Sequence, residues 1–170
     1  MNKKQVSSNK KIILDLERII KKPLDNIETV KWNSYGYELR DEKIIGIGLY
    51  GSEITTLPDS FWELRSLEKL ALVDTRLTAL SSLIRNFVDL LELYIGGNGM
   101  TTVPKEIGTL KKLKFLYILE EKLISLPHEL GSLINLEELS IASEMMNSVP
   151  DSILTLKNSN CRIYLNNEMV

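Results

Sequence analysis

The spacing of apolar residues becomes regular near residue 44. From Ile44 to Asn158 the chain divides into five consecutive units of 23 residues. Nearly every unit has an apolar residue at unit positions 1, 4, 6, 11, 14, 18 and 21. A fixed period of this length is typical of repeat architectures, in which one unit buries its apolar face only against its neighbours. The fixed spacing through all units makes an ordinary α/β domain a poor alternative.

Two positions of each unit predict a short strand. Position 4 is Ile47, Leu70, Leu93, Leu116 and Leu139, and position 6 is Leu49, Leu72, Ile95, Ile118 and Ile141. Residues two apart on a strand point to the same side, so we expect both positions in the core. Position 15 is proline in four units, Pro58, Pro104, Pro127 and Pro150, and Ser81 in the second unit. Proline fixes φ and lacks an N–H, which suits a chain that leaves the strand layer.

The pattern LxxLxLxxNxLxxLPxxIxxLxx resembles the leucine-rich repeat of the intracellular, Ras-group type. The resemblance covers about 115 of the 170 residues. It implies an α/β solenoid with short parallel strands on a concave face and turns or short helices on a convex face. We divide the chain into an N-terminal cap (1–43), five repeats (44–158) and a truncated C-terminal repeat strand (159–170), together one structural domain.

Unit position 9 departs from the family pattern, which has asparagine there to bond the backbone of neighbouring turns. The residues at this position are Ser52, Thr75, Asn98, Glu121 and Glu144. A carboxylate only accepts hydrogen bonds, and its burial would be costly. We therefore expect Glu121 and Glu144 to turn outward, and the strand-exit turns of the fourth and fifth units to be looser than that of the third.

The N-terminal segment predicts a cap for the open end of the solenoid. Residues 9–22 have the pattern of an amphipathic helix, with Asn9 as the N-cap and Pro23 after its end. Residues 29–33 and 36–40 are strand-like and predict a hairpin, and residues 41–43 then turn into the first repeat. The alternative interpretation is a helix that binds a partner.

The C-terminal segment predicts one further strand with Ile163 and Leu165 in the core and Cys161 packed as a small apolar residue. An exposed strand edge can pair with another chain. We expect a monomer, and dimerisation through this edge is the alternative. On the convex side, we expect Trp62 to pack on the next unit near Leu83 or Arg85.

Composition excludes several functions. The net charge is −2, with one histidine, His128, and one cysteine, Cys161. No second histidine or cysteine is present for a metal site, and GGNG at 96–99 lacks the remaining residues of a phosphate-binding loop. We therefore expect no enzyme activity and no cofactor. The near-neutral balance does not favour nucleic-acid binding.

The single cysteine favours a reducing compartment. The basic N-terminus is interrupted by Asp15, Glu17 and Arg18, so we do not interpret it as a signal peptide. No apolar run is long enough to span a membrane. We expect a cytoplasmic protein.

Positions 3, 5 and 7 of each unit should face the concave side, since side chains alternate along a strand. The candidate partner-binding residues are Tyr50, Val73, Glu92, Tyr94, Phe115, Tyr117, Leu119 and Glu138. Aromatic residues also favour strands in general, which is the simpler explanation. A cluster of them on an exposed face is, however, typical of an interface core.

The expected rim of this surface is acidic. Its acids are Glu53, Glu68, Asp74, Glu92, Glu120, Glu121, Glu137, Glu138 and Glu144, and its bases are Lys69, Arg76, Lys114 and Lys122. A partner should therefore be apolar in the middle and basic around it. The charge argues against nucleic acid and anionic membranes.

These observations predict a non-catalytic protein-interaction module or scaffold that binds a protein or peptide on its concave face. The family resemblance implies small GTPases, kinases or phosphatases as partner classes in signalling. A self-associating structural protein is the second hypothesis. Recognition of a small molecule or sugar on the tyrosines is the third, because an open sheet makes a poor small-ligand pocket.

Overall fold

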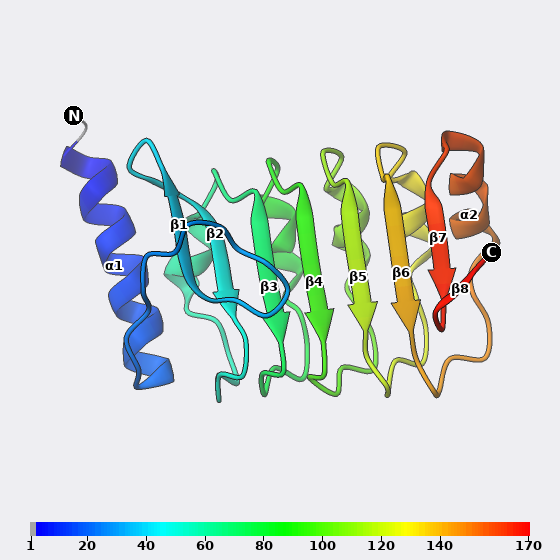
Figure 1. The fold of residues 1–170 in the computed structure, drawn as a ribbon, viewed down its shortest axis with the longest axis horizontal. Helices are drawn as coiled ribbons and strands as arrows, with labels where there is room; N and C mark the ends of the chain where they lie inside the picture. Colours follow the sequence, from blue (N-terminus) through cyan, green and yellow to red (C-terminus); the bar gives the residue numbers. More distant parts are fainter. Residues whose placement is uncertain (1–2) are drawn as a thin grey trace.

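The computed structural model describes residues 3–170, which form a single eight-stranded sheet with helices behind it (Figure 1). The strands follow one another across the sheet in sequence order. Strands β2 to β7 are parallel, and β1 and β8 pair antiparallel at the two ends. This sequential order is that of a solenoid, so the predicted fold class is confirmed.

The strands and their register agree with the predicted period. They are β1 (Tyr35–Arg40), β2 (Lys43–Leu49), β3 (Lys69–Val73), β4 (Glu92–Gly96), β5 (Phe115–Leu119), β6 (Glu138–Ala142), β7 (Arg162–Leu165) and β8 (Glu168–Met169). Equal unit positions lie side by side, for example Leu93 beside Leu116. Side chains at positions 4 and 6 are buried in all five units. They form the continuous apolar column that stabilises stacked repeats.

Short helices return the chain on the other side of the solenoid. They are η1 (Asp59–Glu63), η2 (Ser82–Asn86), η3 (Lys105–Thr109), η4 (His128–Ser132), α2 (Asp151–Leu154) and η5 (Thr155–Ser159). The position-15 prolines precede η1, η3, η4 and α2, and those before η1, η3 and η4 have extended backbone. In the second unit Ser81 takes this place, and its side chain accepts a hydrogen bond from Leu83 N at 3.2 Å. A serine cap thus replaces the proline there.

Trp62 packs on the second repeat, as expected. Its ring stacks on Phe87, with ring centroids 5.5 Å apart, and meets Phe61 edge to face. Phe87 directly follows η2, the turn that contains Leu83 and Arg85, and Asn86 of the same turn donates a hydrogen bond to Trp62 O at 3.2 Å. Trp62 is buried because these three aromatic rings fill the space behind the first two repeats.

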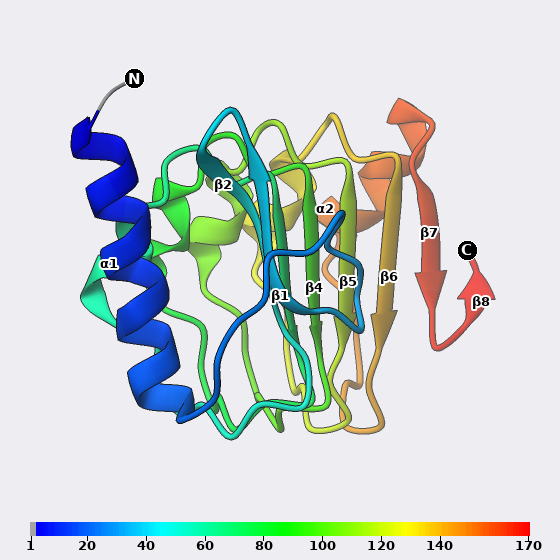
Figure 2. The same ribbon diagram turned by 60° about the vertical axis from the view of Figure 1, so that its left-hand side comes forward.

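The N-terminal helix α1 (Lys3–Ile20) is longer than predicted and lies at the end of the sheet beside the β1–β2 hairpin (Figures 1 and 2). Asn9 is therefore inside the helix, and its expected role as N-cap is wrong. Neither glycine nor proline interrupts residues 3–8, so nothing local ends the helix there. The Asn9 side chain instead donates a hydrogen bond to Glu42 O, which joins the helix to the hairpin turn.

The predicted hairpin of residues 29–33 and 36–40 does not form. Residues 29–33 contain no strand, and β1 pairs with β2 instead. Asp41 and Glu42, both with left-handed backbone, make the tight turn between these strands. Two positive φ values match the twist of a two-residue hairpin, which explains why this pairing wins. Residues 25–27 bond to the outer side of β1 through Tyr37, whose N and O lie 2.8 Å from Asp25 O and Ile27 N.

A row of buried polar side chains follows the exit ends of the strands. Asn98 Oδ1 accepts hydrogen bonds from Thr75 N and Oγ1, at 2.8 and 2.6 Å. Glu120, which is fully buried, accepts from Asn98 N, Asn98 Nδ2, Gly99 N and Met100 N. Glu120 therefore occupies the place that the pattern assigns to position 9, one residue earlier in its unit.

The fifth unit shows the same shift of one residue. Ser143, at position 8, is buried, and its Oγ donates to Leu123 O at 2.6 Å. Glu121 and Glu144 are exposed, as expected. The interpretation of Glu120 as part of an exposed acidic rim is wrong, because its carboxylate satisfies backbone N–H groups that would otherwise be buried without acceptors.

The C-terminal segment continues the sheet beyond the fifth repeat. Ile163 on β7 is buried, Leu165 is partly buried against the core, and Cys161 is buried. Strand β8 pairs with the outer edge of β7, and Val170 N donates to Ile163 O at 3.0 Å. The β7 edge that we considered for dimerisation is therefore already paired within the chain.

Candidate functional site

Two tyrosines from neighbouring strands form a stacked pair on the exposed face of the sheet. Tyr94 on β4 and Tyr117 on β5 are paired in register, and their rings are nearly parallel with centroids 4.9 Å apart. The repeat places equal positions on adjacent strands, so two aromatic residues at position 5 stack.

Hydrogen bonds orient both phenol groups. Tyr94 OH donates to Glu92, and Tyr117 OH donates to Glu138, each at 2.8 Å. Arg162 on β7 in turn donates to the other oxygen of Glu138 at 2.8 Å. These hydrogen bonds restrict the rotation of both rings.

The same environment keeps the phenols protonated. Burial, followed by the hydrogen bond to Glu138, raises the pKa of Tyr117 to about 12. Burial and the hydrogen bond to Glu92 raise the pKa of Tyr94 as well. Both side chains are therefore neutral hydrogen-bond donors at physiological pH.

The pair borders an open groove of about 540 Å³. Its lining residues are Trp32, Val73, Asp74, Tyr94, Ile95, Gly96, Gly97, Tyr117 and Leu119. Leu119 at its edge is 44% exposed, which is unusual for a leucine of a central strand. The strand of Leu119 approaches Gly96 closely, because a Cβ on Gly96 would lie 3.1 Å from Leu119 O. The concave face thus carries a groove where we expected a patch.

Trp32 forms part of the groove and was not among our candidates. It belongs to the loop between α1 and β1, which crosses in front of β2 and β3 (Figure 1). Its ring meets Tyr50 edge to face with centroids 5.9 Å apart, and it remains 54% exposed. An exposed tryptophan held by a second aromatic ring is a suitable anchor for a partner.

Two glycines of β2 allow the loop to lie on the sheet. A Cβ on Gly48 would collide with the Ser34 backbone, and one on Gly46 would collide with Val30. Val30 is consequently buried against the sheet. The sequence contained a sign that the loop covers β2. The first unit alone has glycine at both position 3 and position 5.

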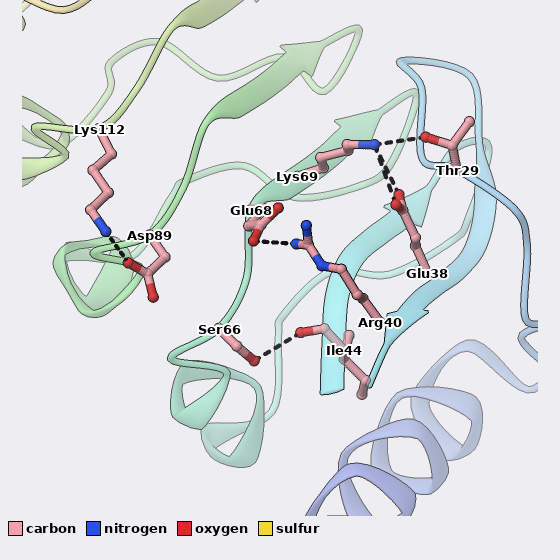
Figure 3. Close-up of polar contacts among 9 residues, drawn as sticks. All are labelled: Thr29, Glu38, Arg40, Ile44, Ser66, Glu68, Lys69, Asp89 and Lys112. Atoms are coloured by element: carbon pink, nitrogen blue, oxygen red, sulfur yellow. Dashed lines mark hydrogen bonds and ion pairs between the residues drawn. The ribbon is translucent and has the colours of Figure 1, made fainter. Parts of the chain in front are cut away.

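The loop is fastened by hydrogen bonds to an ion pair between Lys69 on β3 and Glu38 on β1 (Figure 3). Lys69 Nζ on β3 donates to Thr29 Oγ1 at 2.7 Å and contacts the Glu38 carboxylate at 3.1 Å. Glu38 also accepts a hydrogen bond from Val30 N at 2.9 Å. The chain's own loop therefore covers the concave face of β2 and the beginning of β3, and the open groove begins at Val73 at the end of β3.

The structure brings together some of the predicted residues and separates others. Val73, Tyr94, Tyr117 and Leu119 line the groove, and Tyr50 supports Trp32. Glu92 and Glu138 accept the hydrogen bonds of the two phenol groups and do not line the groove themselves. Phe115, half-buried between Glu92 and Glu138 in register, lies at the other end of β5 and does not line the groove.

Many of the rim carboxylates are paired with basic side chains. The ion pairs join Arg40 to Glu68 (Figure 3), Arg76 to Glu53, Lys114 to Glu137 and Arg162 to Glu138. Lys69 forms an ion pair with Glu38. Glu120 is buried and so does not belong to the exposed rim. The unpaired charge that remains at the groove itself is the exposed carboxylate of Asp74, for which no ion pair is found among residues 3–170.

Two further features are absent from the residues that the structure describes. Within 3–170, no three His, Cys, Asp or Glu side chains gather in a way that could hold a metal ion. Over the same range, no helix has the length and apolar character needed to cross a membrane.

The repeats and the sheet built from them define the class of this protein. A family profile described as leucine-rich repeat region matches residues 46–158. The match spans more than half of the chain, and the chain belongs to the leucine-rich repeat family.

Solved structures share the fold over most of the chain. A leucine-rich repeat protein of Leptospira interrogans is 28% identical with a TM-score of 0.64, over 91% of this chain and 38% of that one. The structure of PEPR1–AtPEP1 is 20% identical with a TM-score of 0.64, over 91% of this chain and 24% of that one. The chain thus spans well under half the length of these proteins. No curated protein matches it in sequence.

Proposed function

We propose that this protein is a non-catalytic interaction module that binds a protein or peptide segment in the groove bordered by Trp32, Tyr94 and Tyr117. The observation that carries the proposal is the stacked tyrosine pair beside an exposed tryptophan on an open groove. Leucine-rich repeat solenoids present extended concave surfaces for binding.

The energetics of interfaces support this site. Tyrosine and tryptophan bury large areas with few rotatable bonds, and they are enriched among residues that dominate binding energy. Here the hydrogen bonds to Glu92 and Glu138 already restrict the tyrosine rings. A partner would therefore lose little side-chain entropy of the site on binding.

The kind of partner follows from the family and the charge. Small GTPases, kinases and phosphatases are the classes that the family resemblance suggests, and the carboxylates near the groove favour a basic segment. The PEPR1–AtPEP1 structure is a fold neighbour and supports no particular partner here. A cytoplasmic location, suggested by the single, buried Cys161, belongs to the same proposal.

A capture experiment tests the site. The wild type, the double variant Tyr94→Ala/Tyr117→Ala and the control Tyr164→Ala are immobilised and exposed to native lysate, and proteins retained by the wild type are purified for affinity measurement. Tyr164 lies beside Ser140 in register on the same side of the sheet, outside the groove. We expect the double variant to lose about 100-fold or more in affinity, since two anchors cost at least about 2.7 kcal/mol together. Equal affinity in all three proteins would refute the site.

Self-association through the terminal edge is the weaker alternative. Within residues 3–170 the outer side of β7 is paired with β8, which leaves only that two-residue strand at the end of the sheet. Short terminal strands of this kind protect sheets against edge pairing. Sedimentation at high concentration distinguishes this alternative, because a concentration-dependent dimer would favour it.

A further inference from the structure

We propose that the groove selects an arginine side chain of the partner, which stacks on Tyr94 between that ring and Trp32 and pairs with the carboxylate of Asp74. This inference rests on the proposed function and specifies the chemistry of the partner. It follows from three features of the groove: a free aromatic face, an unpaired carboxylate and the lack of any basic residue in its lining.

The free aromatic face belongs to Tyr94. Tyr117 covers one face of this ring, so the other is directed towards β3. The residue of β3 paired with Tyr94 is Ala71, which is itself fully buried, and Val73 of the same strand lines the groove. Trp32 lines the same groove from the loop that crosses β3. The groove therefore offers two aromatic side chains, Tyr94 and Trp32, to a planar group.

The carboxylate is that of Asp74, an exposed residue in the lining of the groove. Asp74 follows β3 with left-handed backbone (φ 51°), and its N–H donates to Gly96 O at 2.8 Å. Its Oδ1 lies against Gly97, where any Cβ would collide with it. The neighbouring base Arg76 is paired with Glu53. Asp74 is thus positioned by the backbone and left without a cation of its own among the described residues.

The chemistry favours arginine over other side chains. An apolar side chain would remove water from Asp74 without offering it a partner, which is costly. A lysine ammonium could pair with Asp74, but it is strongly hydrated and has no flat surface to stack. A guanidinium is planar and weakly hydrated, and it combines cation–π contact with charge-assisted hydrogen bonds. The groove volume of about 540 Å³ leaves room for the side chain and part of the peptide.

The test uses short Gly–Ser peptides with one central residue: arginine, lysine, the neutral isostere citrulline, or leucine. Binding is followed by the indole N–H resonance of Trp32 in a nitrogen–proton spectrum of the full chain. Trp62, buried on the opposite side, is the internal reference. We expect the arginine peptide to bind most tightly, followed by lysine, with citrulline about tenfold weaker than arginine, because it lacks the charge for both interactions.

Asp74→Asn and Asp41→Asn form a matched pair of variants. Both aspartates are exposed and have left-handed backbone, which asparagine also adopts, but Asp41 lies in the β1–β2 turn at the opposite end of the strands. We expect Asp74→Asn to weaken the arginine peptide about tenfold and Asp41→Asn to leave it unchanged. Equal binding of the leucine or citrulline peptide, equal loss in both variants, or no effect of Asp74→Asn would overturn the arginine site.

The two proposals fail in different ways. If a captured partner needs Tyr94 and Tyr117 but binds Asp74→Asn normally, the interaction module stands and the arginine site is overturned. If a captured partner is insensitive to the tyrosines, the proposed function itself fails at this site.

Discussion

The carboxylate of Glu120 receives hydrogen bonds from Asn98 of the preceding repeat, from the side-chain Nδ2 at 2.8 Å and from the backbone N at 3.1 Å. Two further N–H groups, those of Gly99 and Met100, point at the same carboxylate. A fully buried charge is costly unless such bonds compensate it. Glu120 therefore joins the third and fourth repeats as the asparagine of the family pattern would.

Removal of the Glu120 carboxylate should destabilise the protein strongly. Glu120→Ala leaves buried N–H groups without an acceptor, and we expect a loss of about 3–5 kcal/mol in the free energy of unfolding. The adjacent Glu121→Ala is the control, because Glu121 is exposed and its loss should change stability by less than about 0.5 kcal/mol. Urea unfolding monitored by circular dichroism measures both. Similar losses in the two variants would contradict the assigned role of Glu120.

Amide exchange distinguishes the strand-exit turns. The sequence predicts lower protection in the fourth and fifth units than in the third. The bonds from Gly99 and Met100 to Glu120 give a physical reason for strong protection in the third unit, since these amides are held by a buried carboxylate. Exchange rates of Gly99 and Met100 well below those of Lys122 and Met145 would agree with this. Equal rates would contradict it.

A methyl group at position 48 should displace the covering loop. In Gly48→Ala the new Cβ meets the Ser34 backbone, which cannot rotate away as a side chain would. We expect a loss of about 1–3 kcal/mol in stability and a change in Trp32 fluorescence. Ser140→Ala changes the equivalent position of the fifth repeat, where no loop lies, and should have little effect. An unchanged Trp32 environment in Gly48→Ala would show that the loop is not held as described.

Loss of the Lys69 ammonium should loosen the same loop. In Lys69→Met the Glu38 carboxylate keeps only the bond from Val30 N and becomes a largely buried charge without a cation. We expect a loss of about 2–4 kcal/mol and faster exchange of the Val30 amide. The double variant Lys69→Met/Glu38→Gln removes the isolated charge and should recover part of the stability. No recovery in the double variant would contradict the ion-pair explanation.

Alkaline pH should weaken the concave face. The pKa of Tyr117 is raised from about 10 to about 12 in the folded protein, first by burial and then by the Glu138 hydrogen bond. A raised pKa means that the stabilising effect is complete below pH 10 and is lost as the pH rises through the folded value. Phenolate absorbance should therefore show late titration of Tyr94 and Tyr117, together with falling stability above pH 10. Tyr117→Phe should reduce this pH dependence, and an unchanged profile in that variant would contradict it.

Part of the site could be predicted from the sequence. The exposed positions of Tyr94, Tyr117 and Leu119 followed from strand alternation, because their neighbours Leu116 and Ile118 belong to the periodic core. Trp32 could not be placed in this way. It lies outside the repeats, and its location depends on a loop path that is set by Lys69 and Glu38, residues 31 apart in sequence.

The sequence by itself determined the solenoid, the strand positions and which side chains share each face. These features depend on the 23-residue period of apolar residues, which can be read from the sequence alone. Only the tertiary structure decided that Glu120 turns inward, that Asn9 bonds the hairpin turn, and that the N-terminal loop covers β2 and the beginning of β3 and brings Trp32 to the groove. Each of these outcomes depends on buried polar groups finding partners in distant parts of the chain, and a local pattern does not specify which partners meet.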